Sequence, residues 1–409
     1  MDSQIISALI FPVFLISSFY SSVQSINNIN QNHQLDDESI KLNYIRDYLK
    51  QINKPYVKTI KSLDGDIIDC VSIHQQPAFD HPLLKGQKII KHPPENLKGH
   101  TSKTDNFEEN FQVWSMSGES CPEKTIPIRR TTEQDVLRAK SVQTFGRKIV
   151  RAGIFGNSHE HAIGSVNGEY YGAQATVNVW GPQIEAVDEF SVSQIWVLAG
   201  SFDSDLNSIE VGWMVDPTLY GDTYTRLFIY WTSDGYQTTG CYNLLCSGFV
   251  QTNQKLLIGT AIQPTSSYNG SQFDIPFYVY KNQTDGNWWL QVKDYIVGYW
   301  PSILFTHLGN ESASLIEFGG EIVNSESSGT HTSTQMGSGH FADEGFGKAS
   351  YFRNIQVVDE NYNLVNVTDI ELTIESPNCY NITKGEWLSH VWGYFFFYGG
   401  PGRGAPGCN

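Results

Sequence analysis

Two apolar segments of the sequence each carry a glutamate where a buried strand would not ordinarily place a charge. In SIEVGWMVDP, side chains that alternate in direction put Glu210 and Gly212 on the face opposite the apolar residues. In LIEFGGEIVN the same alternation places Glu317, Gly319 and Glu321 on one face. Because glycine leaves space for another backbone, both strands could form the floor of a cleft with a carboxylate at its base.

Two carboxylates that face each other can perform acid–base chemistry. When they lie close together they share a proton, so that one pKa rises and the other falls. The charged one can take a proton from water, while the neutral one donates a hydrogen bond to a polarised carbonyl. A solvated sheet face would also carry glutamates, and alternation alone does not separate Glu317 from Glu321.

Other catalytic chemistries find less support in the sequence. There is no G-x-S-x-G motif, and the G-S-G at residues 337–339 lacks its spacing. There is no HExxH, and the H-E-H at residues 159–161 is a bare HxH, more typical of a surface than of a metal site. Neither a P-loop nor a dinucleotide-binding glycine fingerprint occurs. The sequence therefore gives no evidence for a metal or organic cofactor.

The glutamate segments belong to a region rich in short strands. Beyond residue 150, alternating or β-branched runs such as AQATVNVW, SVSQIWVLAG, RLFIYWT and FRNIQVVD are separated by Gly, Asn and Asp. No long amphipathic helix lies between them. This predicts an all-β antiparallel β-sandwich. The earlier part is mixed, with one amphipathic stretch from Asp37 to Lys54 that predicts a helix.

Composition and charge narrow the class of protein. Hydrophobic residues make up 40%, aromatic residues 13% and charged residues 17% of the 409 residues, which is typical of a folded chain. The net charge of −16 argues against a nucleic-acid partner. Residues 1–150 carry 18 basic and 17 acidic side chains, whereas residues 151–409 carry 9 and 26. Two parts with such different charge are expected to have different roles.

The first residues predict a secretory signal peptide, residues 1–25. Ile5 to Phe19 form an apolar run that is short for a membrane span and contains Pro12, and small residues follow it. No other run reaches the roughly 18 apolar residues that a membrane helix needs. We therefore expect a secreted protein without a membrane span.

The cysteines are even in number and fall in two groups. An oxidising compartment predicts one disulfide before residue 150 and two after it, although four cysteines allow three pairings. A Cys241–Cys246 pair would close a tight loop, and a Cys379–Cys408 pair would fasten the C-terminal tail. A zinc site is the alternative interpretation of these cysteines, but no histidine has the spacing from them that a zinc finger requires. The six residues are Cys70, Cys121, Cys241, Cys246, Cys379 and Cys408.

Five N-glycosylation sequons occur, all in the second part of the chain, which predicts that their loops lie on the surface. They are at Asn269, Asn282, Asn310, Asn366 and Asn381.

A basic segment separates the two parts of the chain. Residues 124–151 are rich in Arg and Lys, which is where a processing protease would cut, and we place the boundary at residue 148. This divides the chain into a prosegment, residues 26–148, and a second domain, residues 149–409. A further basic stripe runs from Lys85 to Lys103.

Several long motifs resemble those of the neprosin family of secreted plant proteins. DCVSIHQQPAFDHPLLKGQKI and CPEKTIPIRRTTEQDVLRA resemble the family's activation peptide. The catalytic domain of the family is similar to the second part through EFSVSQIWVLAG, IEVGWMVDPTLYGD, YWTSDGYQTTGCYNLLCSGFVQ, FGGEIVN, THTSTQMGSGHF and FYGGPG. The resemblance covers most of the chain after residue 40.

This resemblance implies a glutamic endopeptidase that cleaves after proline in acid, on a β-sandwich with two catalytic glutamates. The motifs IEVGW and GGEIV assign those roles to Glu210 and Glu321, which also favours Glu321 over Glu317. The family's disulfides fit Cys241–Cys246 and Cys379–Cys408.

We therefore expect a zymogen, acting in the cell wall or in an acidic extracellular fluid, whose prosegment is an intramolecular inhibitor. Its substrates would be proline-containing peptides or proteins. In this hypothesis residues 26–148, which carry the stripe from Lys85 to Lys103, cover the acidic cleft, and the attraction to the stripe weakens as carboxylates protonate. Two alternatives stay open: a glycosidase, which also uses two carboxylates, and a non-catalytic cell-wall or carbohydrate-binding module.

Overall fold

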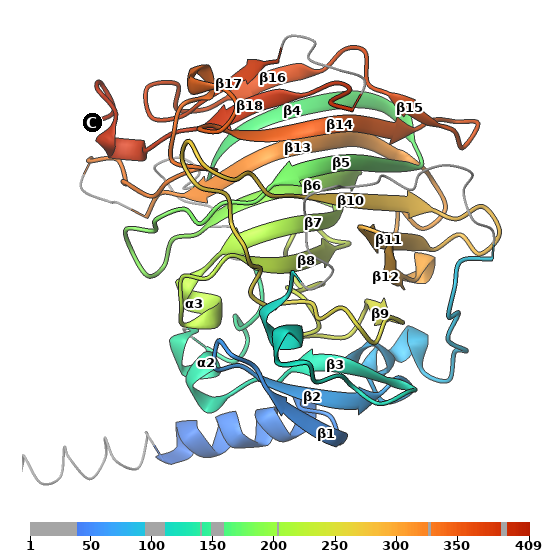
Figure 1. Cartoon of the computed structure of the whole chain (residues 1–409). Helices are drawn as coiled ribbons and strands as arrows, with labels where there is room; N and C mark the ends of the chain where they lie inside the picture. The colour runs from blue at the N-terminus through green and yellow to red at the C-terminus, as the bar shows by residue number, and fades with distance from the viewer. Residues whose placement is uncertain are drawn as a thin grey trace, which may run out of the picture. The chain divides into compact units, whose positions relative to one another are not determined.

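The structure is a computed structural model, and it describes residues 39–94, 111–139, 141–148, 159–202, 204–325, 329–385 and 391–409 (Figure 1). The predicted signal peptide lies outside the described residues. Contacts divide the chain into two compact units, with the division between residues 51 and 52. None of the described helices is long and apolar enough to cross a membrane.

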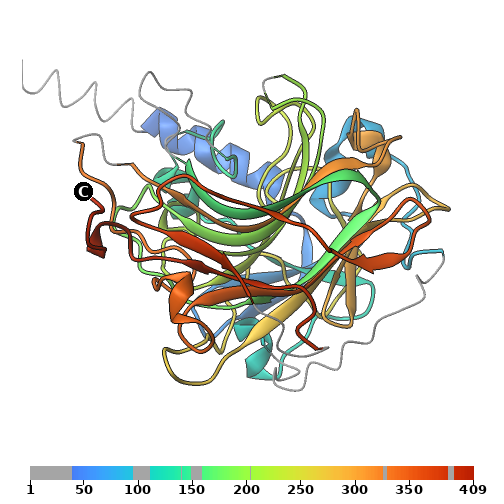
Figure 2. The same ribbon diagram turned by 90° about the horizontal axis from the view of Figure 1, so that it is seen from above.

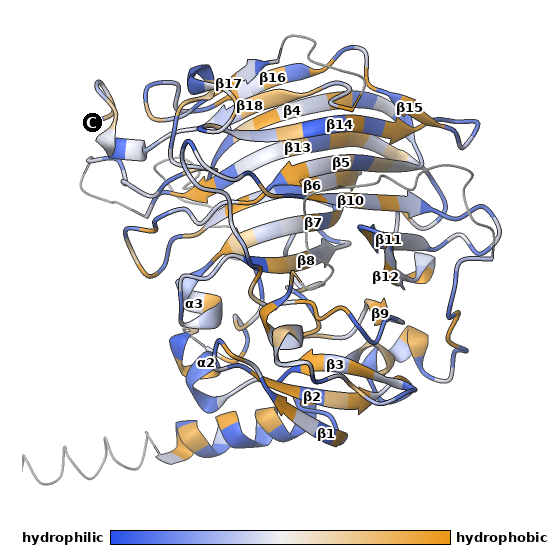
Figure 3. Ribbon diagram, in the orientation of Figure 1, coloured by the Kyte–Doolittle hydropathy of each residue, from blue (hydrophilic) through white to orange (hydrophobic). Residues whose placement is uncertain are grey.

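A helix over residues 39–52 lies within the stretch that the sequence predicts to be an amphipathic helix. Hydrophilic and hydrophobic residues alternate along it in Figure 3. One residue, Ile45, is buried, while most of the others are exposed.

The second unit begins with a small antiparallel sheet in the order β1-β2-β3. Its strands are β1 (Tyr56–Lys61), β2 (Ile67–Ser72) and β3 (Thr125–Arg129). A disulfide between Cys70 and Cys121 fastens it, and α2 (Glu133–Arg138) follows, capped by the Thr132 hydroxyl. The prosegment is therefore mixed α+β, as the sequence predicts.

Two larger antiparallel sheets follow. The nine-stranded sheet has the order β17-β18-β14-β5-β10-β11-β12-β9, with β15 paired to β14. Its strands are β5 (Gly172–Asn178), β9 (Val250–Gln251), β10 (Asp274–Lys281), β11 (Trp288–Val292), β12 (Tyr295–Trp300), β14 (Ser350–Val358), β15 (Leu364–Asn366), β17 (Asn381–Lys384) and β18 (Phe396–Gly399).

The six-stranded sheet has the order β16-β4-β13-β6-β7-β8. Its strands are β4 (His159–Tyr170), β6 (Ser191–Ala199), β7 (Asn207–Val215), β8 (Arg226–Thr232), β13 (Ala313–Val323) and β16 (Glu371–Ile374). A short helix, α3 (Pro217–Tyr220), links β7 to β8. The 3-10 helices are η1 (Pro77–Asp80), η2 (Pro82–Leu84), η3 (Val113–Ser117), η4 (Ser302–Leu304), η5 (Ala342–Glu344) and η6 (Gly402–Gly404).

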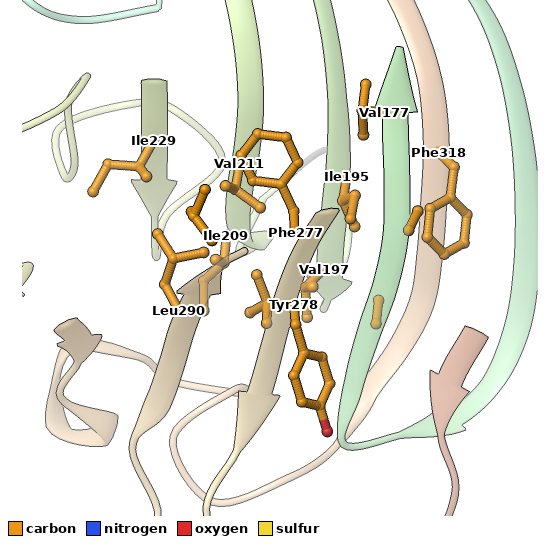
Figure 4. Close-up of a cluster of buried hydrophobic side chains, with 14 of the residues drawn as sticks. Val177, Ile195, Val197, Ile209, Val211, Ile229, Phe277, Tyr278, Leu290 and Phe318 are labelled. Carbon is orange, nitrogen blue, oxygen red and sulfur yellow. The ribbon is translucent and has the colours of Figure 1, made fainter. Parts of the chain in front are cut away.

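The two large sheets pack face to face, as Figure 2 shows from above, which confirms the predicted antiparallel β-sandwich. Apolar side chains from β6 and β7 meet those from β5 and β10 (Figure 4). Ile209 and Val211 of β7 have no exposed surface, as alternation predicts. The opposite face of β7 is also buried, because further segments of the chain cover it.

Glycines at two strand positions allow the strands of the six-stranded sheet to approach one another. In β7, Gly212 lies opposite Gln194 of β6. A Cβ added to Gly212 would lie 2.0 Å from the carbonyl oxygen of Ser193. In β13, a Cβ on Gly319 would lie 2.2 Å from the carbonyl oxygen of Ala162. Each glycine is thus required by the backbone of the neighbouring strand, as the sequence suggested.

Replacing Gly212 by alanine (Gly212→Ala) is expected to lower the free energy of unfolding by at least about 2 kcal/mol, because the new methyl group would push β6 and β7 apart. Urea unfolding at neutral pH measures this. As a control, Gly181→Ala should change little, since its nearest neighbour would be the Thr225 hydroxyl at 3.7 Å. Equal stability of both variants would contradict the explanation.

Candidate active site

The two glutamates that the sequence identifies lie on the same face of the six-stranded sheet, Glu210 in β7 and Glu321 in β13. Strand β6 lies between them. Both side chains are buried, with 1% and 0% exposed. They contact the same cation, because Lys148 Nζ lies 3.3 Å from Glu210 Oε2 and 2.9 Å from Glu321 Oε2. The residue predicted as the end of the prosegment therefore lies between the two carboxylates.

Glu210 has two further partners, both hydroxyl groups on its other oxygen. Tyr236 donates to Glu210 Oε1 at 2.7 Å, and the Ser208 hydroxyl donates to the same atom at 3.0 Å. Burial, together with the charge of Glu210, raises the pKa of Tyr236 well above its ordinary value. The tyrosine therefore stays a neutral donor.

Glu321 has partners of a different kind. The Gln194 amide donates to Glu321 Oε2 at 3.0 Å, and His159 Nδ1 lies 2.5 Å from Glu321 Oε1. A second imidazole, that of His161, is 3.9 Å from the same oxygen through Nε2. The oxygen of the Gln194 side chain is buried and has no hydrogen-bond partner in the described structure.

Electrostatics keep this buried cluster charged. Burial alone would lower the pKa of Lys148, but the charges of Glu210 and Glu321 outweigh it and raise this pKa above its ordinary value. Burial would likewise raise the pKa of Glu321, but Lys148 and then His159 outweigh burial and hold it well below its usual range. The intact chain therefore holds Lys148 as a cation against an ionised Glu321.

The third glutamate of this face, Glu317, lies outside the cluster. It is half-buried, and the Ser165 hydroxyl donates to its Oε1 at 3.2 Å. Burial raises the pKa of Glu317. Among the described residues it does not contact Lys148, so the structure separates it from Glu321 where strand alternation could not.

The segment of residues 141–148 brings Lys148 into the cleft. The Gly146 carbonyl accepts a hydrogen bond from the Tyr242 amide at 2.8 Å, and Arg147 donates to the Thr238 carbonyl at 2.6 Å. Gly146 has a φ of +73°, and a Cβ there would lie 2.9 Å from the Leu245 side chain. The loop that receives the segment is closed by the Cys241–Cys246 disulfide.

A cavity of about 630 Å³ lies beside the cluster. The segment of residues 141–148 forms part of its lining together with His159. Apolar and aromatic side chains from the sandwich, Phe190, Tyr242 and Val323 among them, complete it. Asp216, at the start of α3, also lines it, and burial raises the pKa of Asp216 to about 6.

A second buried ion-pair network joins the three-stranded sheet to β8. Arg226, which has no exposed side-chain surface, donates to Asp66 Oδ2 at 2.6 Å and to Asp222 Oδ2 at 2.6 Å. Arg129 of β3 donates to the other oxygen of Asp66 at 2.8 Å. The region predicted to be the prosegment is thus held by buried charges at two separate places.

The described part of the basic stripe does not cover the acidic cleft, and the prediction that the H-E-H is a surface motif is wrong. Lys85, Lys88 and Lys91 of the basic stripe are exposed and form no ion pair with any residue that the structure describes. The rest of the stripe, beyond residue 94, lies outside the described residues. The H-E-H at residues 159–161 is not a surface motif, because His159 is buried and contacts Glu321.

The cysteines pair as Cys70–Cys121, Cys241–Cys246 and Cys379–Cys408, and no described cysteine is free. His331 lies close enough to the last pair to complete a metal-ligand geometry, but both of those sulfurs are already in the disulfide. This grouping therefore offers no thiolate to a metal.

The sequon asparagines differ in exposure. Asn269, Asn310 and Asn366 are exposed, and Asn381 is half-buried. Asn282 is buried, and its side-chain oxygen accepts hydrogen bonds from the amides of Thr284 and Asp285. A glycan on Asn282 would require this turn to open, so the structure argues against that one site.

Sequence reasoning missed four groups that complete the site: Lys148, His159, Gln194 and Tyr236. One signal was available, since alternation in β4 places His159 and His161 on a common face. Lys148 was noticed only as a processing site, because nothing in the sequence shows that residues 141–148 enter the cleft.

Comparison with known proteins identifies two regions of the chain. A family model described as Neprosin matches residues 187–401, and one described as Neprosin activation peptide matches residues 59–165. The second match extends past the predicted boundary at residue 148 into β4.

Solved structures show only slight likeness. Scytalido-glutamic peptidase with a transition state analog inhibitor has 13% identity and a TM-score of 0.34, covering 58% of this chain and 97% of its own. The eqolisin-family peptidase SCP-B has 11% identity and a TM-score of 0.31, covering 59% and 96%. The agglutinin CG-16 from chicken liver has 9% identity and a TM-score of 0.21, covering 38% and 89%. These likenesses are too slight to carry an argument.

Replacing Lys148 by methionine (Lys148→Met) is expected to lower the free energy of unfolding of the intact chain at pH 7 by about 3 kcal/mol, because two buried carboxylates lose their common cation. The pKa of Glu321 is depressed in the folded chain. Its stabilisation is therefore complete above the unfolded pKa of about 4.3 and is lost as the pH falls from there toward the folded value.

Urea unfolding at pH 7 and in acid measures this difference, which should shrink in acid. As a control, Lys58→Met removes an exposed ion pair with Glu119 and should cost less than about 1 kcal/mol. A loss for Lys148→Met no greater than that of the control would contradict the bridging role.

Proposed function

Because the chain belongs to the neprosin family, we propose that it is the zymogen of a secreted glutamic endopeptidase that cleaves peptide bonds on the C-terminal side of proline in acid. The matches to the Neprosin and Neprosin activation peptide models support a peptidase made with an activation peptide. The observation that carries the proposal is the buried pair Glu210 and Glu321, which lie on one face of the six-stranded sheet and contact the same nitrogen.

The pair can hydrolyse a peptide bond without a covalent intermediate. One ionised carboxylate takes a proton from water as the water oxygen bonds to the peptide carbonyl carbon. The other, protonated, donates a hydrogen bond to the developing oxyanion. The first carboxyl then gives its proton to the leaving nitrogen as the C–N bond breaks, which yields a carboxylic acid and an amine.

The contacts that remain after Lys148 leaves favour one assignment of roles. Glu321 keeps the Gln194 amide and His159, whereas Glu210 keeps only the hydroxyls of Ser208 and Tyr236. Cationic and amide donors favour the ionised form. We therefore assign the general base to Glu321 and the protonated partner to Glu210. The unpartnered oxygen of Gln194 is suited to accept a hydrogen bond from the attacking water.

Latency follows from the position of Lys148. Its ammonium group occupies the space between the carboxylates where the peptide carbonyl and water would bind. We assign residues 26–148 to the prosegment, residues 149–409 to the catalytic domain and the activating cut to the region between Lys148 and Arg151. Because residues 149–158 lie outside the described residues, the cut itself stays a prediction.

Acid weakens the hold of Lys148 on the cleft. The pKa of Glu321 is low while Lys148 is bound, and removal of that cation lets it rise. Binding of the prosegment is therefore favourable above the pKa that Glu321 has once Lys148 is removed. This binding is lost progressively as the pH falls below that pKa.

Specificity and location have separate support. The cavity beside Glu321 presents Phe190 and Tyr242, and aromatic faces suit the proline ring. Three disulfides are typical of an oxidising, extracellular compartment, which agrees with the predicted signal peptide. The cell wall or an acidic extracellular fluid would supply the pH.

The acid-treated, processed protein should cleave a quenched proline-containing peptide after proline, with more activity in acid than at pH 7. Glu321→Gln should reduce kcat/KM by about 10³-fold or more, because an amide cannot act as the general base, and Glu210→Ala by about 10²- to 10³-fold, because the oxyanion donor is lost. Fluorescence and mass spectrometry of the products measure rate and position.

The matched control is Glu317→Gln, a glutamate of the same strand face outside the bridging cluster, which should keep wild-type activity. Full activity in either Glu210→Ala or Glu321→Gln would contradict the mechanism. Cleavage of a glycan panel instead of the peptide would identify the two carboxylates as those of a glycosidase.

A further inference from the structure

We propose that His159 is a positioning residue that keeps Glu321 ionised in acid, and so sets how far into acid the enzyme works. This rests on the proposed function. His159 lies outside the two glutamates that the family motifs identify, and it stays in place when the prosegment leaves.

The geometry ties His159 to Glu321. His159 Nδ1 lies 2.5 Å from Glu321 Oε1, the oxygen that Lys148 does not contact. Both side chains are buried, with 6% and 0% exposed. A donor at this distance, out of water, favours the ionised carboxylate strongly.

His159 belongs to the sandwich rather than to the removable part of the chain. It is the first residue of β4, which pairs with β13 so that His159 lies opposite Val323 and His161 opposite Glu321. A cut between Lys148 and Arg151 therefore leaves this histidine on the catalytic domain. The ring of Phe190 packs edge-on against it, with centroids 5.6 Å apart, which limits its rotation.

The change on activation makes this contact decisive. In the intact chain Glu321 contacts the ammonium group of Lys148 through one oxygen and the imidazole of His159 through the other. When Lys148 leaves, His159 is the closest potential cation, and an imidazole carries its positive charge in acid. It thus replaces part of the attraction that Lys148 supplied, at the pH at which the enzyme has to act.

The other charged groups near His159 do not take over this role. On β4, Glu160 points to the opposite face and pairs with His331 at 2.8 Å. His161 pairs with Glu375 at 2.8 Å and is more distant from Glu321, at 3.9 Å.

The remaining neighbours are in the cavity or on β13. Arg147 and Lys148 leave with the prosegment, while Asp188 and Asp216 stay as lining residues. Because burial raises the pKa of Asp216 to about 6, it is neutral in acid and does not compete for the imidazole. Glu317 of β13 bonds to Ser165.

The test compares pH profiles of kcat/KM for processed wild type, His159→Gln and His159→Lys on the proline peptide. Loss of a positive charge at position 159 raises the pKa of the general base, Glu321, and a general base is inactive once it is protonated. The acidic limb of His159→Gln should therefore move to higher pH by about one unit or more, with little change at the optimum. His159→Lys restores a positive charge and should return the limb toward that of the wild type.

The matched control is His331→Gln, which removes a similarly buried imidazole from Glu160, a glutamate outside the cleft. The acidic limb of the kcat/KM profile of His331→Gln should lie at the same pH as that of the wild type. His159→Asn repeats the loss of charge with a smaller side chain, and it is scored in place of His159→Gln if the latter has a lowered thermal midpoint.

The outcomes separate this inference from the proposed function. A limb that does not move in His159→Gln or His159→Asn, or activity lost equally at every pH, overturns the positioning role while the peptidase stands. A wild-type protein that has lost its prosegment and cleaves no peptide overturns the proposed function itself. A shifted limb that lysine restores supports both.

Discussion

The structure depends on one constraint: two carboxylates buried in the same cleft require a cation or a proton. Glu210 and Glu321 have almost no exposed surface, and removing such ions from water costs several kcal/mol each unless they are paired. In the intact chain Lys148 meets this need. In the proposed active form a proton on one glutamate and the imidazole of His159 on the other would replace it.

The surrounding elements follow from this pairing. Gly212 lets β7 approach β6 closely. Gln194 is the residue of β6 opposite Gly212, and it therefore lies in the strand between the two glutamates. The turn at Gly146 and the disulfide-closed loop that receives it bring Lys148 to the cleft. In the proposed zymogen, the ion pair between Asp66 and Arg226 would also hold the prosegment, so its release would require more than the loss of Lys148. Latency and chemistry would then use the same charges.

Part of this arrangement could be predicted from the sequence. Period-two alternation identified the faces of Glu210 and Glu321, and short β-branched runs indicated the sandwich. Lys148 was not predicted as a partner, because it is 62 residues from Glu210 and 173 from Glu321 along the chain and only tertiary folding brings them together. The H-E-H at residues 159–161 was predicted to be a surface motif, because these three residues alone do not show that His159 is buried. The basic stripe from Lys85 to Lys103 can be compared with its prediction only up to residue 94, where its lysines are exposed.

The most direct test of the central claim is the protonation state of the pair before and after release. Difference infrared spectra of the carboxyl region, taken at about pH 6 where ordinary carboxylates are ionised, would compare the intact chain with the processed protein. The account predicts a neutral carboxyl band that depends on Glu210: processed wild type shows it and processed Glu210→Gln lacks it, over the constant contribution of Asp216, whose pKa burial raises to about 6. An equal Glu210-dependent band in the intact chain, or no difference between the two processed proteins, would contradict the account.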